Sequence, residues 1–332
     1  MTTIAFGGDT MLGRLVAERI AERGPGVIWG NILRDLWSAD LLCVNLECAL
    51  TTHTAPWLDG QRKAFYFGAH PRAVEALHIA GVDLVSLANN HVLDFREAGL
   101  RETVATLDAA GIAHAGAGSD LAAAACPGRI DADGLRVAVV AFTDHPDEWA
   151  AGLASAGTNH LRISAGAGHH AVVRRALAAA REGADLVVLS LHWGPNMRER
   201  PSPEFRELAR AAVESGADVV WGHSAHVVQG IEFHRGRPIL YDTGELVDDY
   251  AVDADLRNDL GALFLLRVRP GSIEEVSLVP LRIADMRVSR LEGREREWLV
   301  DRVRRLCAEL GTEVVMADKR IVARARIGAR SH

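Results

Sequence analysis

The chain has 332 residues, 48% of them hydrophobic and 24% charged, which is enough for one large α/β domain or two smaller ones. A formal net charge of −7 with a pI near 6.1 argues against a nucleic-acid surface, and the sequence contains no apolar run of about twenty residues that would cross a membrane. The N-terminus has no basic, apolar leader and the four cysteines show no C-x-x-C spacing, so we expect a cytoplasmic protein with reduced thiols.

In the first part of the chain, apolar segments alternate with helical periods. Residues 4–6 are predicted to form a short strand that the two following glycines break, which would leave Asp9 exposed at its carboxyl end. A helix to about Arg23 follows, and buried strands are predicted at residues 39–44 and 82–87. Apolar strands separated by helices are typical of a sheet that is covered on both faces.

The same alternation continues to the C-terminus, where the last dozen residues are basic and are expected to form either a mobile or a packed-down tail. Glycines and prolines at the expected boundaries support the assignments. The predicted helices lie at 100–110, 169–181, 203–215 and 294–310, and the predicted strands at 112–115, 128–130, 135–142, 185–191, 217–221, 238–241, 260–269 and 273–280.

Polar residues of the types that bind metals follow the predicted strands. His223 and His226 come directly after the apolar run 217–221, three positions apart on a loop that begins with Gly222. Neutral imidazole is the commonest metal-binding side chain, although such a pair by itself could equally cap a strand end. Four other predicted strands also end in acidic, amide or imidazole residues, namely Asp9, Glu47, Asn90 and His192. The set predicts a metal site above one edge of the sheet.

Five motifs occur in an order that resembles the CapA family, which is named for poly-γ-glutamate capsule synthesis and lies within the calcineurin-like metallophosphoesterase superfamily. The resemblance covers roughly the first 250 residues and implies a four-layer α/β/β/α sandwich. We therefore expect a catalytic domain over residues 1–285, with a C-terminal helix and basic tail over 286–332 packed on the same domain. The motifs are Gly-Asp-x-Met-Leu-Gly-Arg from Gly8, Asn45-Leu-Glu47, Leu87 to Asp94, His192-Trp-Gly and Gly222 to His226.

The resemblance also implies a two-metal centre at the carboxyl edge of the sheet. A bridging carboxylate can hold two cations about 3.5–4 Å apart, and the cations lower the pKa of a bound water towards about 7. Mixed nitrogen and oxygen ligands suit Mn²⁺, Fe²⁺ or Zn²⁺, with one or two ions per chain. By this resemblance one metal would take Asp9, Glu47 and His226, and the other Glu47, Asn90, His192 and His223, with Glu47 bridging.

Three further residues are candidates for catalysis. By the same resemblance His91 would be an unliganded acid or electrostatic group over the metals, but it could also orient a neighbour or hold a loop. Asp94 could act in catalysis, or fasten its turn and hold His91. Arg14 could clamp an anion in a bidentate manner, since its guanidinium would lie near the metal edge, or it could be a surface residue.

Two positions depart from the pattern of the superfamily. Many members have histidine where this chain has Met11, which would leave the first metal short of a ligand. Many capsule-type members have Ser-Leu-Gly-Asn where this chain has residues 242–245. The acidic segment of Glu245, Asp248, Asp249 and Tyr250 could add ligands, bind a cationic group or cap a loop. The N-terminal anchor common in capsule-type members is not seen, which argues against an assembly role at the cell envelope.

Three functions remain open from the sequence. The first is a metal-dependent hydrolase of a phosphoester, or of an amide in a glutamate-rich or peptide substrate. The second is a metal-dependent peptide Cα epimerase, which is suggested by the missing histidine ligand at Met11. The third is a binding or scaffold protein with a vestigial metal site. In each case we expect a monomer or homodimer that binds an anionic small molecule or peptide. We expect it to bind neither nucleic acid nor a membrane.

Overall fold

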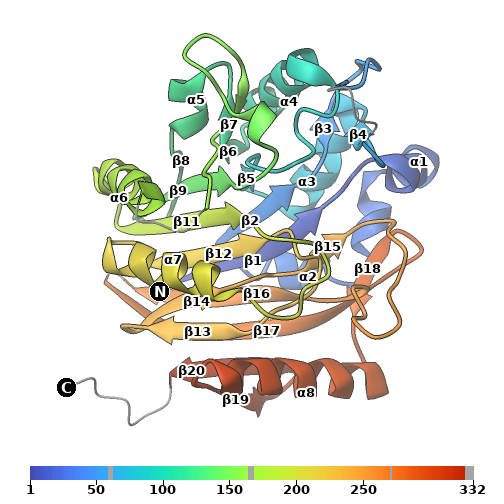
Figure 1. Ribbon diagram of the computed structural model, residues 1–332. Helices are drawn as coiled ribbons and strands as arrows, with labels where there is room; N and C mark the ends of the chain where they lie inside the picture. Colours follow the sequence, from blue (N-terminus) through green and yellow to red (C-terminus); the bar gives the residue numbers. More distant parts are fainter. Residues whose placement is uncertain (59–62, 164–167, 270, 326–332) are drawn as a thin grey trace.

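Two β-sheets form the centre of the molecule (Figure 1), for which the computed structural model describes residues 1–58, 63–163, 168–269 and 271–325. Within these residues, one sheet has ten strands and the other has six. In spatial order the larger sheet consists of β19 (Thr312–Ala317), β20 (Arg320–Ala325), β17 (Ser272–Ala284), β16 (Leu260–Arg269), β1 (Thr2–Thr10), β2 (Leu41–Leu46), β5 (Leu84–Ser86) and β6 (Ala113–Ala115), with β15 (Glu245–Val247) beside β1 and β18 (Arg287–Arg290) beside β17. The smaller sheet consists of β13 (Ile231–His234), β14 (Arg237–Leu240), β12 (Val219–His223), β11 (Leu186–His192), β9 (Leu135–Thr143) and β8 (Gly128–Ala132).

Helices cover the outer faces of both sheets, and the C-terminal helix packs against the core between them. The α-helices are α1 (Arg14–Arg23), α2 (Leu33–Leu36), α3 (Val74–Ala80), α4 (Arg96–Ala110), α5 (Leu121–Ala125), α6 (Gly168–Arg181), α7 (Pro203–Glu214) and α8 (Gly293–Glu309). Short 3₁₀ turns are η1 (Pro25–Trp29), η2 (Pro71–Ala73) and η3 (Asp147–Trp149), and two small ribbons pair β3 (Ala49–Leu50) with β4 (Gly68–Ala69) and β7 (Ala117–Gly118) with β10 (Gly157–Thr158).

Three apolar cores separate four layers. Between the sheets, Phe6 of β1 packs on Trp221 of β12, with 5.3 Å between the ring centroids. Outside the larger sheet, Leu42 of β2 belongs to a core shared with α1, α3 and α4. Outside the smaller sheet, Leu189 of β11 belongs to a core shared with α6 and α7. The predicted four-layer α/β/β/α sandwich is confirmed.

The central strands of each sheet run parallel, and this arrangement determines where the site lies. β1, β2 and β5 are parallel neighbours in the larger sheet, as are β9, β11 and β12 in the smaller one. The carboxyl ends of parallel strands meet at one edge of a sheet, which in open α/β sheets is where ligands bind. Because β1 and β12 contact each other across the sandwich, the carboxyl edges of the two sheets also meet.

The first strand differs from its prediction. β1 does not end at Phe6 but runs from Thr2 through Thr10, with an irregularity in its pairing to β2 between Phe6 and Asp9. Asp9 is fully buried rather than exposed. The reason is that β15, from a distant part of the chain, lies against β1. The carbonyl of Gly244, the residue just before β15, accepts a hydrogen bond from the Asp9 amide at 2.9 Å.

The C-terminal segment also differs from its prediction. The helix predicted at 294–310 is present as α8, which runs along the lower side of the molecule in Figure 1. The first residues of the expected tail, 321–325, instead belong to β20, which forms a hairpin with β19 and extends the larger sheet from β17. Alternating apolar residues, among them the fully buried Ile321, drive this pairing. The rest of the expected tail, 326–332, lies outside the described residues.

Most other predicted elements are confirmed within a few residues. The helix predicted at 100–110 begins earlier, at Arg96, and ends before Gly111 as expected. The hairpins of β8 with β9 and of β16 with β17 are present, although the turn residue 270 lies outside the described residues. Among the described helices, none is both long enough and apolar enough to cross a membrane.

Candidate metal centre

The six residues predicted as metal ligands lie together where the two sheets meet. Each comes from the carboxyl end of a parallel strand or from the loop directly after it. Strand pairing aligns these ends within each sheet, and the contact of β1 with β12 brings the two edges to one place. The side chains are buried except for Asn90, which is partly exposed, and they are Asp9, Glu47, Asn90, His192, His223 and His226.

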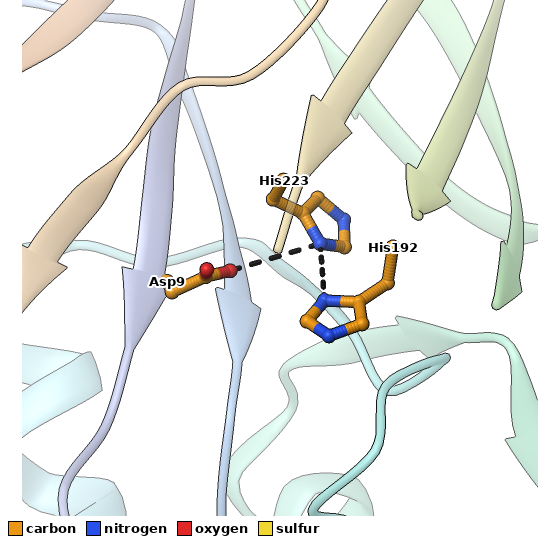
Figure 2. Close-up of side chains that lie close together, drawn as sticks. All are labelled: Asp9, His192 and His223. Carbon is orange, nitrogen blue, oxygen red and sulfur yellow. Dashed lines mark hydrogen bonds and ion pairs between the residues drawn. The ribbon is translucent and has the colours of Figure 1, made fainter. Parts of the chain in front are cut away.

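Two histidines form the first group with Asp9 (Figure 2). The Nδ1 atoms of His192 and His223 are 2.9 Å apart, and Asp9 Oδ1 is 3.7 Å from His223 Nδ1. Asn90 adds an amide oxygen 3.0 Å from His192 Nε2. Burial lowers the pKa of His223 to about 4, and burial together with the neighbouring His223 lowers the pKa of His192 well below its usual value. Both rings are therefore neutral at pH 7, the form that binds metals.

Carboxylates dominate the second group, which shares Asp9 with the first. Its ligand atoms, from Asp9, Glu47, His226 and Glu245, all lie within 4.8 Å of one another. Asp9 Oδ2 is 3.3 Å from His226 Nδ1, a nitrogen that also contacts Glu245 Oε1. Glu47 Oε1 is 3.9 Å from His192 Nε2, so this carboxylate lies between the two groups.

The side chains of this centre fit bound cations. Glu47 Oε1 and Glu245 Oε2 are buried and have no hydrogen-bond partner among the described residues. Burial raises the pKa of both carboxyl groups well above its usual value, and the charge of Asp9 adds to the shift. Burial lowers the pKa of His226, but Glu245 and Glu47 outweigh it and hold that pKa well above its usual value. A divalent cation would satisfy the unpaired oxygens and the excess of negative charge.

Two buried asparagines, Asn45 and Asn89, hold Asp9 in place. Asn45 donates from Nδ2 to Asp9 Oδ1 at 2.7 Å, and Asn89 donates from Nδ2 to Asn45 Oδ1 at 3.1 Å. Asn89 Oδ1 in turn accepts hydrogen bonds from the backbone amides of His91 and Val92, both at 3.0 Å. In the sequence, the only sign of this role was that both asparagines follow an apolar run. That pattern does not distinguish a turn residue from one that orients a metal ligand.

His91 and Asp94 form a pair at the edge of the centre. His91 Nδ1 is 2.6 Å from Asp94 Oδ2, and the imidazole stacks on Phe67 with 3.8 Å between the ring centroids. Lys63 donates to Asp94 Oδ1 at 2.6 Å. Burial lowers the pKa of His91 to about 4, although Asp94 raises it. The pairing leaves Nε2 as the ring nitrogen available to a ligand.

A cavity of about 540 Å³ opens over this edge of the centre. His91 and His226 belong to its lining, and Phe65, Phe67 and Tyr250 supply aromatic surface. The third catalytic candidate, Arg14, also lines it, with its guanidinium 4.9 Å from the centroid of the Phe65 ring. The cavity therefore combines a cationic group, an aromatic wall and the outer side of the metal-ligand cluster.

The acidic segment after β14 has several roles rather than one. Glu245 enters the carboxylate group, and Asp249 ion-pairs with Arg14 at 3.3 Å while accepting the Leu15 amide at 3.0 Å. Asp242 accepts the amides of Ala225 and Gly244 at 2.7 and 2.8 Å, which fixes the loop that carries His226. Asp248 is buried, and this burial raises its pKa to about 7.

Comparison with known proteins identifies the family to which the chain is similar. The model of the family "Bacterial capsule synthesis protein PGA_cap" matches residues 3–250. A probable polyglutamine synthesis accessory protein of Mycobacterium tuberculosis is 32% identical over 358 residues, covering 95% of this chain and 93% of that protein. The capsule biosynthesis protein CapA of Bacillus anthracis is 28% identical over 287 residues, covering 85% of this chain and 68% of that protein.

A crystal structure of a hypothetical protein from Thermus thermophilus shares the fold, with a TM-score of 0.51 and 18% identity over 84% of this chain and 99% of that one. The family match spans all five motifs, from Gly8 to His226, and ends at Tyr250, the last residue of the acidic segment. The chain belongs to the bacterial capsule synthesis protein family PGA_cap, the CapA family, within the calcineurin-like metallophosphoesterase superfamily.

Proposed function

We propose that the protein is a metal-dependent hydrolase that cleaves a phosphoester or amide bond in a substrate carrying further anionic groups. The observation that carries the proposal is that buried carboxylates and imidazoles converge beneath a cavity lined by His91. Two of the carboxylate oxygens, from Glu47 and Glu245, have no hydrogen-bond partner among the described residues. When bound, divalent cations supply Lewis-acid polarisation of the substrate oxygen and a more acidic water.

The cavity indicates the kind of substrate. Arg14 is held at the mouth by Asp249 and by the Phe65 ring, so its guanidinium is positioned for a phosphate or carboxylate. The relatives that are named for capsule or polyglutamine synthesis support a polymeric substrate, and a glutamate polymer would present one carboxylate per residue. The aromatic wall of Phe67 and Tyr250 would contact the apolar part of such a chain.

His91 would carry the proton. A water attacks the phosphorus or carbonyl carbon, a new bond to oxygen forms, and the bond to the leaving oxygen or nitrogen breaks. His91 accepts the proton of this water at Nε2 and returns it to the leaving group, while Asp94 accepts from Nδ1 and fixes the ring. The leaving group thus departs protonated and the enzyme returns to its starting state.

The test is hydrolysis of a bis-aryl phosphodiester and of poly-γ-glutamate by protein loaded with Mn²⁺. Glu47→Gln should lower turnover by more than about 100-fold and also lower the metal content, because the carboxylate lies between the two ligand groups. His91→Gln should lower turnover by about 10²–10⁴-fold with the metal content unchanged, because it removes only the proton carrier.

Matched controls are Glu232→Gln and His234→Gln, which alter the same residue types on β13, outside the metal-ligand cluster. Both should keep turnover within about twofold of the unaltered protein. Metal-loaded protein that hydrolyses neither substrate, or a His91→Gln variant with full turnover, would contradict the proposal.

The structure weakens the argument for a peptide epimerase. That alternative depended on a ligand missing at Met11, and the structure places the Glu245 carboxylate beside Asp9 in the same group. The scaffold alternative predicts substoichiometric metal, and the measurement of metal content described above also decides that point.

A further inference from the structure

The position of Glu245 is determined by the pairing of β15 with β1. The two strands run parallel, and in their register Glu245 lies directly opposite Asp9. Its side chain is buried, with Oε1 against His226 Nδ1 and Oε2 without a hydrogen-bond partner among the described residues. This carboxylate therefore points into the group formed by Asp9, Glu47 and His226.

Met11 occupies the position at which many related phosphoesterases carry a histidine ligand, and it turns away from the centre. Its side chain is fully buried in the core outside the larger sheet, together with Leu12 and Val16. Its Sδ accepts a hydrogen bond from the Gly13 amide at 3.0 Å. The thioether is thus engaged by its own loop and by apolar neighbours.

We propose that Glu245 takes the place of the histidine missing at position 11. It makes the metal position formed with Asp9, Glu47 and His226 (the first position) a carboxylate-rich site for a hard divalent cation such as Mn²⁺. The second position, with His192, His223 and Asn90, keeps the nitrogen-rich character that suits Zn²⁺ or Fe²⁺. The inference rests on the proposed function only in requiring that the cluster binds metal.

Ligand chemistry gives the reason for this division. Carboxylate oxygens suit Mn²⁺ and Mg²⁺, whereas imidazole nitrogens suit Zn²⁺, Fe²⁺ and Ni²⁺. The first position offers carboxylates from Asp9, Glu47 and Glu245 but a single imidazole, from His226. Exchange of a neutral histidine for glutamate also adds one negative charge, which strengthens the binding of a divalent ion in a buried position.

The test is metal binding by the full chain, measured without any substrate. Chelator-treated protein is titrated with Mn²⁺ or Zn²⁺, bound metal is counted by elemental analysis, and Mn²⁺ is followed by electron paramagnetic resonance. Glu245→Gln should lose one Mn²⁺ per chain, or bind it at least about tenfold more weakly, while retaining Zn²⁺ at the histidine-rich position. Glu232→Gln, a buried carboxylate that accepts from Tyr241 instead, should bind as the unaltered protein does.

Glu245→Asp provides a second variant if the glutamine variant folds poorly. It keeps the charge but shortens the side chain, so it should weaken Mn²⁺ and again spare Zn²⁺. Unchanged Mn²⁺ binding in a folded Glu245→Gln variant would overturn the assignment of Glu245 while leaving the proposed hydrolase intact. Unaltered protein that binds neither ion would instead overturn both proposals.

Discussion

At the scale of single residues, the metal centre depends on side chains that position its ligands without being ligands themselves. Asn45 and Asn89 fix the Asp9 carboxylate and the backbone of the loop that carries His91. Partners of this kind orient ligands and raise their affinity for metal. Asp94 has the corresponding role for the ring of His91.

Asn45→Ala removes the amide that donates to Asp9 Oδ1. We expect metal affinity to fall by about 10–100-fold, because the carboxylate loses its fixed orientation, and folding stability to fall by about 1–3 kcal/mol. Calorimetric titration with Mn²⁺ measures the first and urea unfolding the second.

Asn159→Ala is the matched control for this change. It removes another buried amide, one that donates to the Ala141 carbonyl at 2.8 Å and lies outside the ligand cluster. It should lose stability to a similar degree and bind metal normally. Equal metal affinity in the two variants would show that Asn45 has only a structural role.

At the scale of elements, the alignment of strand ends decides which side chains meet. The loop after β12 carries Ser224 and His226, both with positive φ. The Ser224 and Ala225 amides donate hydrogen bonds to the carboxylates of Asp9 and Asp242, and these bonds hold the loop in place. Non-glycine residues in this conformation persist only where surrounding contacts impose it. The pairing of β15 with β1 adds Glu245 to the same edge.

Gly8→Ala tests this pairing. A Cβ at position 8 would lie 1.8 Å from the Gly244 carbonyl oxygen, so β15 must move away from β1. We expect a loss of about 3 kcal/mol or more in the free energy of unfolding, and weaker Mn²⁺ binding because Glu245 leaves its register. Urea unfolding and metal titration are the measurements.

Gly26→Ala is the control at this scale. A Cβ at that position would meet only Ile79 side-chain atoms, at 3.8 Å, which is ordinary contact. The variant should differ from the unaltered protein by less than about 1 kcal/mol. If both variants were equally stable, the close approach of β15 to β1 would not be needed for the fold.

At the scale of the whole molecule, the layered packing decides the chemistry of the cysteines. All four lie in the described residues; Cys43, Cys48 and Cys307 are buried and Cys126 is exposed. Cys43 and Cys307 belong to the core between the sheets, and Cys48 to the core outside the larger sheet. Burial raises the pKa of all three buried thiols, to about 12 for Cys48 and Cys307.

Titration with a disulfide reagent at pH 8 should therefore detect one thiol per native chain and four after unfolding in guanidinium. The raised pKa keeps the three buried groups as unreactive thiols below about pH 10, in addition to their lack of access. Cys126→Ser should abolish the fast reaction of the native protein. Rapid reaction of more than one thiol would show that the layers open readily.

Much of the fold could be predicted from the sequence, because strand and helix signals are local. The runs before Glu47, His192 and His223 are apolar over most of the strand, and a polar residue at the end of each marks a carboxyl edge. Lateral pairing was harder to predict. No strand was predicted for β19, and most of β20 was expected to belong to the basic tail. Their pairing was not evident because β17, the strand on which β20 pairs, lies earlier in the chain.

The sequence by itself determined the residue types of the centre and the strand ends that carry them. The carboxyl ends of parallel strands meet at one edge of a sheet, so motifs at those ends were sufficient to predict that the six candidate ligands lie together. The sequence assigned Asp9 and the pair His192 and His223 to different metals, and the tertiary structure also groups Asp9 with that pair. Only the tertiary structure placed Glu245 beside Asp9 and turned Met11 into the core. The physical reason is that these positions depend on which distant segments pair and in which register, a property of contacts across the fold rather than of any local pattern.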